Sequence, residues 1–251
     1  IAWAYDGSNS LYSFFGTTNY SYQGKYFATA TVRYDKSSRF SGDNKSDIFP
    51  SFSAGWLLSK EDFFPKDAVV SRLKLKASWG ELGNQTLPSD NPTINISSLS
   101  ESGANYSFDG SSITTGAMLS FVGNSDLKWE TSVAKNFGID LGLYDNALSV
   151  SFEYFNILTK DLITRDNSLI SSTAIDAAAP LVNLGSVKNT GFDMSIGYNN
   201  KTTSGVTYGI QANISKYKNE VTELINAFQS GYSGFRGGAV TRTEVGRPIS
   251  S

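Results

Sequence analysis

Apolar and polar residues alternate with a period of two over many stretches of this chain, the spacing that puts successive side chains on opposite faces of a β-strand. The stretch Ser71–Trp79 illustrates the pattern, with Leu73, Leu75, Ala77 and Trp79 set against Arg72, Lys74, Lys76 and Ser78. The alternation predicts eight strands, and the polar partner positions predict that one face of each meets water or a polar lumen. The predicted strands are Leu11–Tyr22, Lys25–Tyr34, Ile48–Leu58, Ser71–Trp79, Val133–Leu143, Ala147–Tyr154, Phe192–Tyr198 and Val206–Ser215.

The connections between these strands alternate in length. Short turns are expected at Gln23-Gly24, Asp145-Asn146 and Asn199–Gly205, with a medium turn at Ser59–Val70; Asp-Asn suits a tight hairpin because both residues tolerate positive φ. Long polar connections are expected at Asp35–Asp47, Glu81–Lys128, Thr159–Lys188 and after Tyr217. Short turns at one end and long loops at the other are typical of an outer-membrane β-barrel.

Aromatic residues near strand ends favour the same interpretation, because Tyr and Trp gather where a membrane meets water. The predicted belt residues are Tyr20, Tyr22, Tyr26, Tyr34, Trp56, Trp79, Trp129, Tyr144, Tyr198 and Tyr217. The alternative is a soluble β-sandwich that binds carbohydrate, in which the apolar faces cover a core. The long loops on one side argue against this alternative, since compact soluble domains rarely carry them.

Composition narrows the chemistry. The 251 residues include no His and no Cys, so imidazole bases, thiolate nucleophiles, disulfides and the common zinc sites are excluded. Asp161 with Asp166, or Glu220 with Glu223, would be the candidate acid–base pairs, but carboxylates near strand ends are usually solvated. We therefore expect no enzyme, no cofactor and no metal site. The net charge of −2 argues against a nucleic-acid partner.

Seven segments, in order from about Tyr12 to the end, carry a resemblance to one family. They are Tyr26–Phe40, Phe49–Trp56, Leu73–Gln85, Leu127–Thr131, Asp161–Ile163, Asn183–Phe192 and Glu244–Ser251. Together they resemble SusC/RagA-type TonB-dependent transporters of the Bacteroidetes. Physical interpretations stand beside this resemblance: Phe49-Pro50 fits a strand start, where proline need not donate, and Gly80 and Gly83 fit a strand exit that needs backbone freedom.

The resemblance implies an all-β fold in which residues 1–251 form about eight strands of a 22-stranded transmembrane barrel, from its central to later part, with no plug domain and no signal peptide visible. It implies a nutrient importer of the bacterial outer membrane that takes up oligosaccharides or peptides. The implied partners are a SusD-like surface lipoprotein, the TonB complex acting through a plug region, and outer-membrane lipid. A further alternative is a complete eight-stranded barrel acting as anchor or adhesin, which predicts that Leu11–Tyr22 pairs with Val206–Tyr217.

Two sets of residues are candidates for contact with a ligand or plug. If the apolar row of Ser71–Trp79 faces lipid, the basic row faces the lumen, because a charge at mid-bilayer costs about 2–4 kcal/mol. The lumenal or plug-facing candidates are Arg72, Lys74 and Lys76. The loop candidates for substrate binding, which would stack on sugar rings or clamp polar groups, are Tyr106, Phe108, Phe121, Arg165, Tyr232, Phe235 and Arg236.

Overall fold

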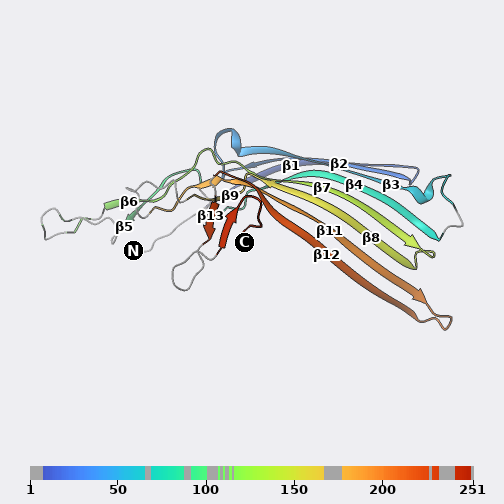
Figure 1. Ribbon diagram of the computed structural model, residues 1–251. Coiled ribbons are helices and arrows are strands. Elements are labelled where there is room, and N and C mark those ends of the chain that lie inside the picture. The colour runs from blue at the N-terminus through green and yellow to red at the C-terminus, as the bar shows by residue number, and fades with distance from the viewer. Residues whose placement is uncertain are drawn as a thin grey trace.

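One eight-stranded antiparallel sheet dominates the computed structural model (Figure 1), which describes residues 8–65, 69–87, 92–100, 107, 110, 113–114, 116–166, 177–225, 228–231 and 241–249. Its strand order is β1-β2-β3-β4-β7-β8-β11-β12, so the neighbours in the sheet follow the order of the chain. The strands are β1 (Leu11–Tyr22), β2 (Tyr26–Ser37), β3 (Ser46–Leu57), β4 (Val70–Asn84), β7 (Glu130–Leu143), β8 (Leu148–Lys160), β11 (Gly185–Lys201) and β12 (Thr207–Leu224).

All eight predicted strands are present, which confirms the fold class, and β1 has the predicted bounds. Several others run further toward the long connections than the alternation indicates: β4 continues to Asn84 and β12 to Leu224. Backbone pairing continues there after the apolar pattern has ended. Within the described residues β1 and β12 form opposite edges of the sheet. The hypothesis of a complete eight-stranded barrel, which needs these two strands to pair, is therefore wrong.

Short turns gather at one end of the sheet, as Figure 1 shows. Tyr144, Asp145 and Asn146 all have positive φ, at 52°, 55° and 65°, so the Asp-Asn pair occupies the left-handed region as predicted. The β3–β4 connection at the same end contains the 3-10 helix η2 (Leu58–Lys60).

The long connections carry structure of their own at the opposite end. They contain the 3-10 helix η1 (Gly42–Lys45) and three pairs of short strands. The pairs are β5 (Ile96–Ser100) with β6 (Gly116–Phe121), β9 (Ile163–Arg165) with β10 (Leu181–Asn183), and β13 (Phe228–Gly231) with β14 (Thr241–Glu244). These short strands, which the sequence pattern did not predict, show that the loops are built up from hairpins.

The register gives the large sheet one apolar and one polar face. One transverse row of the apolar face consists of Tyr22, Tyr26, Trp56, Leu75, Ile139, Phe152, Met194 and Ile214. The adjacent row of the polar face consists of Phe27, Gly55, Lys76, Gly138, Glu153, Asp193 and Ser215. Large side chains of the apolar face are uncovered, with Phe137 61% and Ile210 71% exposed. No second sheet covers this face in the described part of the chain, so the sandwich alternative is not favoured.

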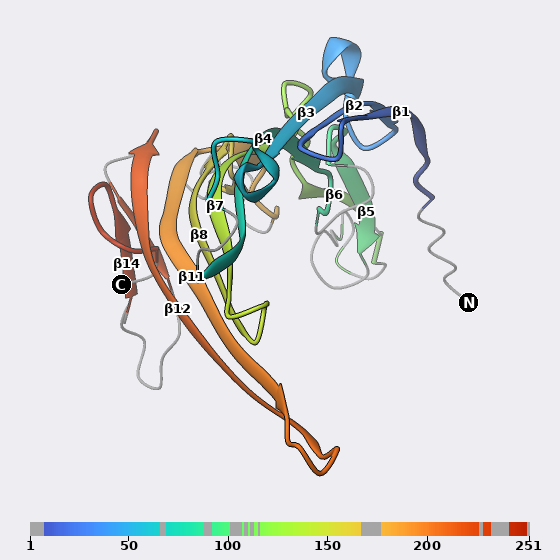
Figure 2. The same cartoon turned by 90° about the vertical axis from the view of Figure 1, so that its right-hand side faces the viewer.

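The apolar face forms a band that crosses the strands obliquely. Counted from the row of Tyr26 toward the long connections, the apolar positions on β2 continue to Tyr34. On β12 the apolar positions end at Ile214, which lies in that same row. The boundary thus moves by eight residues over six strand-to-strand steps, about 1.3 residues per strand. With ~3.3 Å per residue and ~4.8 Å between strands, a band parallel to a membrane implies strands tilted by about 40–45°, within the range of membrane barrels. Figure 2 shows the curvature and stagger of the same strands.

A buried cluster holds the long connections together at their base. Its members are Phe40, Phe49, Leu87, Leu127, Trp129 and Leu181, with Ile163 packed against them. Trp129 is 4% exposed, stacks on Phe40 at 4.8 Å between centroids, and donates from Nε1 to the Asn44 carbonyl at 3.0 Å. The prediction that Trp129 belongs to a lipid-facing belt is therefore wrong. So is that for Tyr217, which pairs with Gly191 in a polar-face row.

Two further expectations about local structure need correction. Pro50 lies inside β3, opposite Val32, and not at a strand start. It is tolerated because β4 pairs with β3 only from Ser51 onward, leaving the proline without a β4 partner. Gly83 also lies inside its strand, where the Phe49 ring fills the place that a Cβ would take. Close approach of an aromatic ring, and not backbone freedom, explains this glycine.

Candidate functional site

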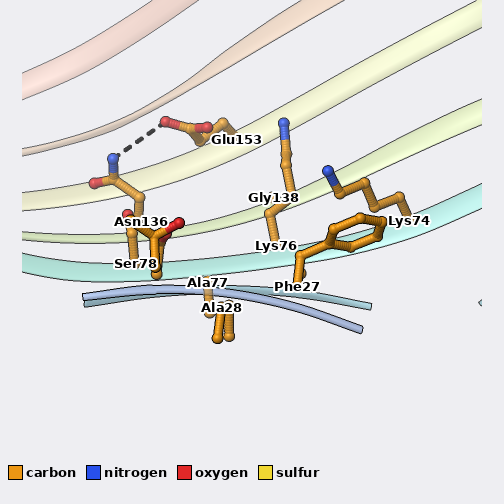
Figure 3. A pocket seen from close by; sticks show the side chains of 13 residues that line it. Phe27, Ala28, Lys74, Lys76, Ala77, Ser78, Asn136, Gly138 and Glu153 are labelled. Carbon is orange, nitrogen blue, oxygen red and sulfur yellow. Dashed lines mark hydrogen bonds between the residues drawn. The ribbon is translucent and has the colours of Figure 1, made fainter. Parts of the chain in front are cut away.

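Two lysines of β4 lie flat against the polar face of the sheet, over glycines of the neighbouring strands (Figure 3). A Cβ on Gly55 of β3 would stand 3.1 Å from Cε of Lys74, and a Cβ on Gly138 of β7 would stand 2.8 Å from Cε of Lys76. The two side chains therefore extend in opposite directions across the sheet. The glycines make this possible by leaving room for the lysine stems.

Each lysine reaches a partner on another strand. Lys74 Nζ lies 5.1 Å from the ring centroid of Phe27 on β2, which is a cation–π contact. Lys76 Nζ lies 2.8 Å from Oδ1 of Asp140 on β7, and the hydroxyl of Ser151 donates to the same oxygen at 2.8 Å. Both lysines are thus held close to the wall by partners that compensate their charge.

Acidic residues lie beyond Lys76 in its transverse row. Asn136 Nδ2 donates to Oε1 of Glu153 at 3.2 Å, and Glu153 stands directly opposite Asp193 on β11. Like charges in directly opposed positions repel, so this pair favours an approaching cation. A hollow of about 350 Å³ opens over this part of the wall. Its lining includes Phe27, Thr29, Ser53, Lys74, Lys76, Ser78, Asn136 and Glu153.

The predicted basic row lies on a single face. Arg72 stands opposite Gly142, on the same face as Lys74 and Lys76 but closer to the short turns, and its side chain is exposed. Lys74 and Lys76 line the hollow, together with the residues of β7 and β8 that the sequence pattern did not single out. Asn136 and Glu153 carry no signal of their own in the sequence, because their proximity to β4 depends on the register across a long connection.

The loop candidates are only partly within the described residues. Phe121 is 7% exposed, and the guanidinium Cζ of Arg165 lies 5.5 Å from its ring centroid. Arg165 also donates from Nη1 to the Ala179 carbonyl at 2.8 Å. This pair fastens one loop to another, and its role in substrate binding stays a prediction. The other candidates lie outside the described residues: Tyr106, Phe108, Tyr232, Phe235 and Arg236.

A carboxylate at the short-turn end organises the aromatic residues there. Oε1 of Glu61 accepts hydrogen bonds from the hydroxyl of Tyr26 at 2.6 Å and from Nε1 of Trp56 at 2.9 Å, while Oε2 faces Lys25 Nζ at 3.0 Å. The hydrogen bonds from Tyr26, Trp56 and Lys25 lower the pKa of Glu61 to about 2. Sequence reasoning missed Glu61, since a single acid in a turn gives no signal.

Neither metal-binding chemistry nor a helical span is apparent in the part of the chain that the structure describes. No three Asp or Glu side chains there gather as ligands for a metal ion. Among the same residues, no helix has the length and hydropathy to span a bilayer.

An antiparallel sheet with an oblique apolar band, an aromatic cluster at its short-turn end and a polar opposite face defines the wall of a membrane β-barrel. Residues 2–246 match the family model described as TonB dependent receptor-like, beta-barrel. The chain therefore belongs to the family of TonB-dependent receptor β-barrels, which places it in the outer membrane.

Curated relatives agree with this assignment. The chain is 34% identical over 221 residues to a TonB-dependent receptor of Formosa agariphila, covering 88% of the chain and 21% of that receptor. It is 32% identical over 240 residues to the TonB-dependent receptor SusC of Bacteroides thetaiotaomicron, covering 95% of the chain and 23% of SusC. The chain thus spans about a fifth to a quarter of the length of these relatives.

Solved structures give the same picture. The structure of the RagAB peptide transporter matches with a TM-score of 0.80 and 25% identity, over 96% of this chain and 25% of that one. The siderophore receptor PirA of Pseudomonas aeruginosa matches with a TM-score of 0.51 and 18% identity, which shows a shared fold alone.

Proposed function

We propose that residues 1–251 form part of the barrel wall of an outer-membrane nutrient importer that takes up oligosaccharides or peptides. One observation carries this proposal. The strand register gives the sheet an apolar band on one face and, on the other face, charged side chains that lie over glycines. SusC and the RagAB peptide transporter, to which the chain is similar, support this class of function. Among the described residues β1 and β12 pair with no further strand of the large sheet, which fits a wall that continues into further strands of a 22-stranded barrel.

The polar face is proposed to contact the plug domain of the complete transporter. Lys74 and Lys76 are already held by Phe27 and Asp140, so they present their stems and a fixed charge to the lumen. Glu153 and Asp193 offer two adjacent carboxylates to a basic group of the plug. The TonB complex would act through the plug, a SusD-like lipoprotein would cover the long-connection end, and the loops would meet the substrate. The wall itself is proposed to perform no catalysis.

Uptake by intact cells tests this proposal. A strain lacking the gene, a complemented strain and a complemented strain without TonB would be supplied with labelled oligosaccharides and peptides. Import that requires both the gene and TonB supports the proposal. The importer assignment fails if the three strains accumulate all of the labelled oligosaccharides and peptides equally. Uptake of a known TonB-dependent substrate, which should still require TonB, is the control.

A further inference from the structure

The lipid-facing side of the wall becomes rich in lysine where the apolar band ends on the long-connection side. On β7 the outward position after Phe137 is Lys135, and on β12 the outward position after Ile214 is Lys216. On β7, β8, β11 and β12 the outward lysines at this level are Lys135, Lys160, Lys188, Lys216 and Lys218. A row of cations at one edge of the band is not needed for strand pairing, which the backbone provides.

Three of these lysines line one groove of about 340 Å³. The register places the groove on the lipid-facing side. Lys135 pairs with Asn156, and this pair is the next one on the same face after Phe137 and Tyr154, toward the long connections. Its complete lining is Val133, Lys135, Asn156, Leu158, Lys160, Lys188 and Thr222. Two apolar side chains, three ammonium groups, an amide and a hydroxyl therefore share one concave surface.

Positive charge exceeds negative charge in and beside the groove within the described part of the chain. No carboxylate lines it, and none of Lys135, Lys160 and Lys188 forms an ion pair with a described acid. Two acids share the transverse row of Lys188 but lie outside the lining, namely Glu81 opposite Val133 and Glu220 opposite Lys188. Glu220 attracts Lys188, but its carboxylate is already engaged by Lys218 at 2.6 Å. The groove is therefore electrostatically suited to an anion.

We infer that this groove binds the phosphate of an anionic lipid headgroup in the leaflet next to the long connections. Its height fits this ligand, because it begins where the outward side chains cease to be apolar and headgroups replace acyl chains. A lysine at such a boundary lays its stem along apolar surface, which Val133 and Leu158 supply here, and extends its ammonium group to the polar layer. Asn156 adds amide hydrogen-bond donors for phosphate oxygens, while the hydroxyl of Thr222 donates to the Ser186 carbonyl at 3.2 Å. An acidic protein segment is a poorer occupant, since the groove opens toward the bilayer.

Titration of the full-length transporter in detergent with fluorescent diphosphoryl lipid A measures the interaction. A basic side chain near an anionic lipid surface contributes about 1 kcal/mol, which is about fivefold in affinity. The double variant K135Q/K188Q should therefore weaken binding by about 25-fold. The variant K135R/K188R should bind within about threefold of wild type, because arginine keeps both charges. Wild-type protein should bind the same lipid without its phosphates much more weakly.

The matched control is K60Q/K201Q, which also removes two exposed lysine charges but at η2 and at the β11–β12 turn, at the opposite, short-turn end of the sheet. It should leave the affinity within twofold of wild type. The inference is overturned if K135Q/K188Q binds like wild type, or if the control loses as much affinity. It is also overturned if millimolar inorganic pyrophosphate displaces the lipid completely, since the site would then serve a soluble anion.

Discussion

The ring of Phe49 lies directly over the backbone of Gly83, in the place that a Cβ on β4 would occupy. Phe49 is one of the buried residues at the base of the long connections, so it has little room to move. We expect Gly83→Ala to destabilise the full-length protein by about 1–3 kcal/mol through overpacking. The midpoint of thermal unfolding in detergent measures this loss.

Gly16→Ala is the control for that experiment. Gly16 also lies within a strand of the same sheet, but no atom stands within 4 Å of the place for its Cβ. Its substitution should leave the midpoint unchanged or raise it slightly, because alanine restricts the unfolded chain. Equal effects of the two substitutions would show that Phe49 does not constrain Gly83.

Removal of Trp129 should loosen the long connections without disturbing the sheet. Truncation of a buried aromatic residue costs about 3–5 kcal/mol, and Trp129→Ala also removes the hydrogen bond to the Asn44 carbonyl. Limited proteolysis of the folded full-length protein should give faster cleavage within 38–45 and 121–129. Trp79→Ala, which removes an aromatic ring that stacks on Phe52 on the apolar face, should leave the cleavage pattern as in wild type.

The ion pair between Lys76 and Asp140 should contribute a modest coupling energy. Both side chains are only partly buried, so we expect about 0.5–1 kcal/mol in a double-mutant cycle of Lys76→Gln and Asp140→Asn. High salt should reduce the coupling because the lumenal face is wet. A coupling that is zero at low salt, or that grows with salt, would contradict an electrostatic contact.

Acid should weaken the short-turn end through Glu61. The pKa of this carboxyl is lowered from 4.5 to about 2 in the folded protein, chiefly by the hydrogen bond from Tyr26. A depressed folded-state pKa stabilises the protein above pH 4.5, and this contribution is lost as the pH falls from 4.5 toward 2. The difference in thermal midpoint between wild type and Glu61→Gln should therefore shrink across that window. A constant difference between pH 6 and pH 2 would show that Glu61 does not titrate there.

Local alternation was sufficient to predict the large sheet, because the side chains of a barrel wall must alternate between lipid and a polar lumen. The Asp145-Asn146 turn was likewise visible, since few residues accept positive φ. The features that the sequence pattern did not predict depend on contacts between distant segments. Trp129 looked like a belt residue because nothing local reveals that Phe40 covers it. Gly83 looked like a flexible exit for the same reason, as its neighbour Phe49 belongs to another strand.

The candidate site was predictable to a similar degree. The pattern of β4 alone places Lys74 and Lys76 on one face, but Phe27, Asp140 and Glu153 join them only through the register of other strands. Short strands such as β9 and β10, three residues each, are too brief for a periodic signal. The structure of the long connections therefore could not be derived from alternation.

The order of strands also has a kinetic consequence. Each strand of the large sheet pairs with the next large strand along the chain, so three short-turn hairpins can form with little loop closure. The buried base of the loops is different, because Trp129 meets Asn44 across 85 residues of chain. Contacts of such high sequence separation form slowly. The long-connection end of the barrel should thus be the last region to fold during assembly, after the hairpins have already entered the bilayer.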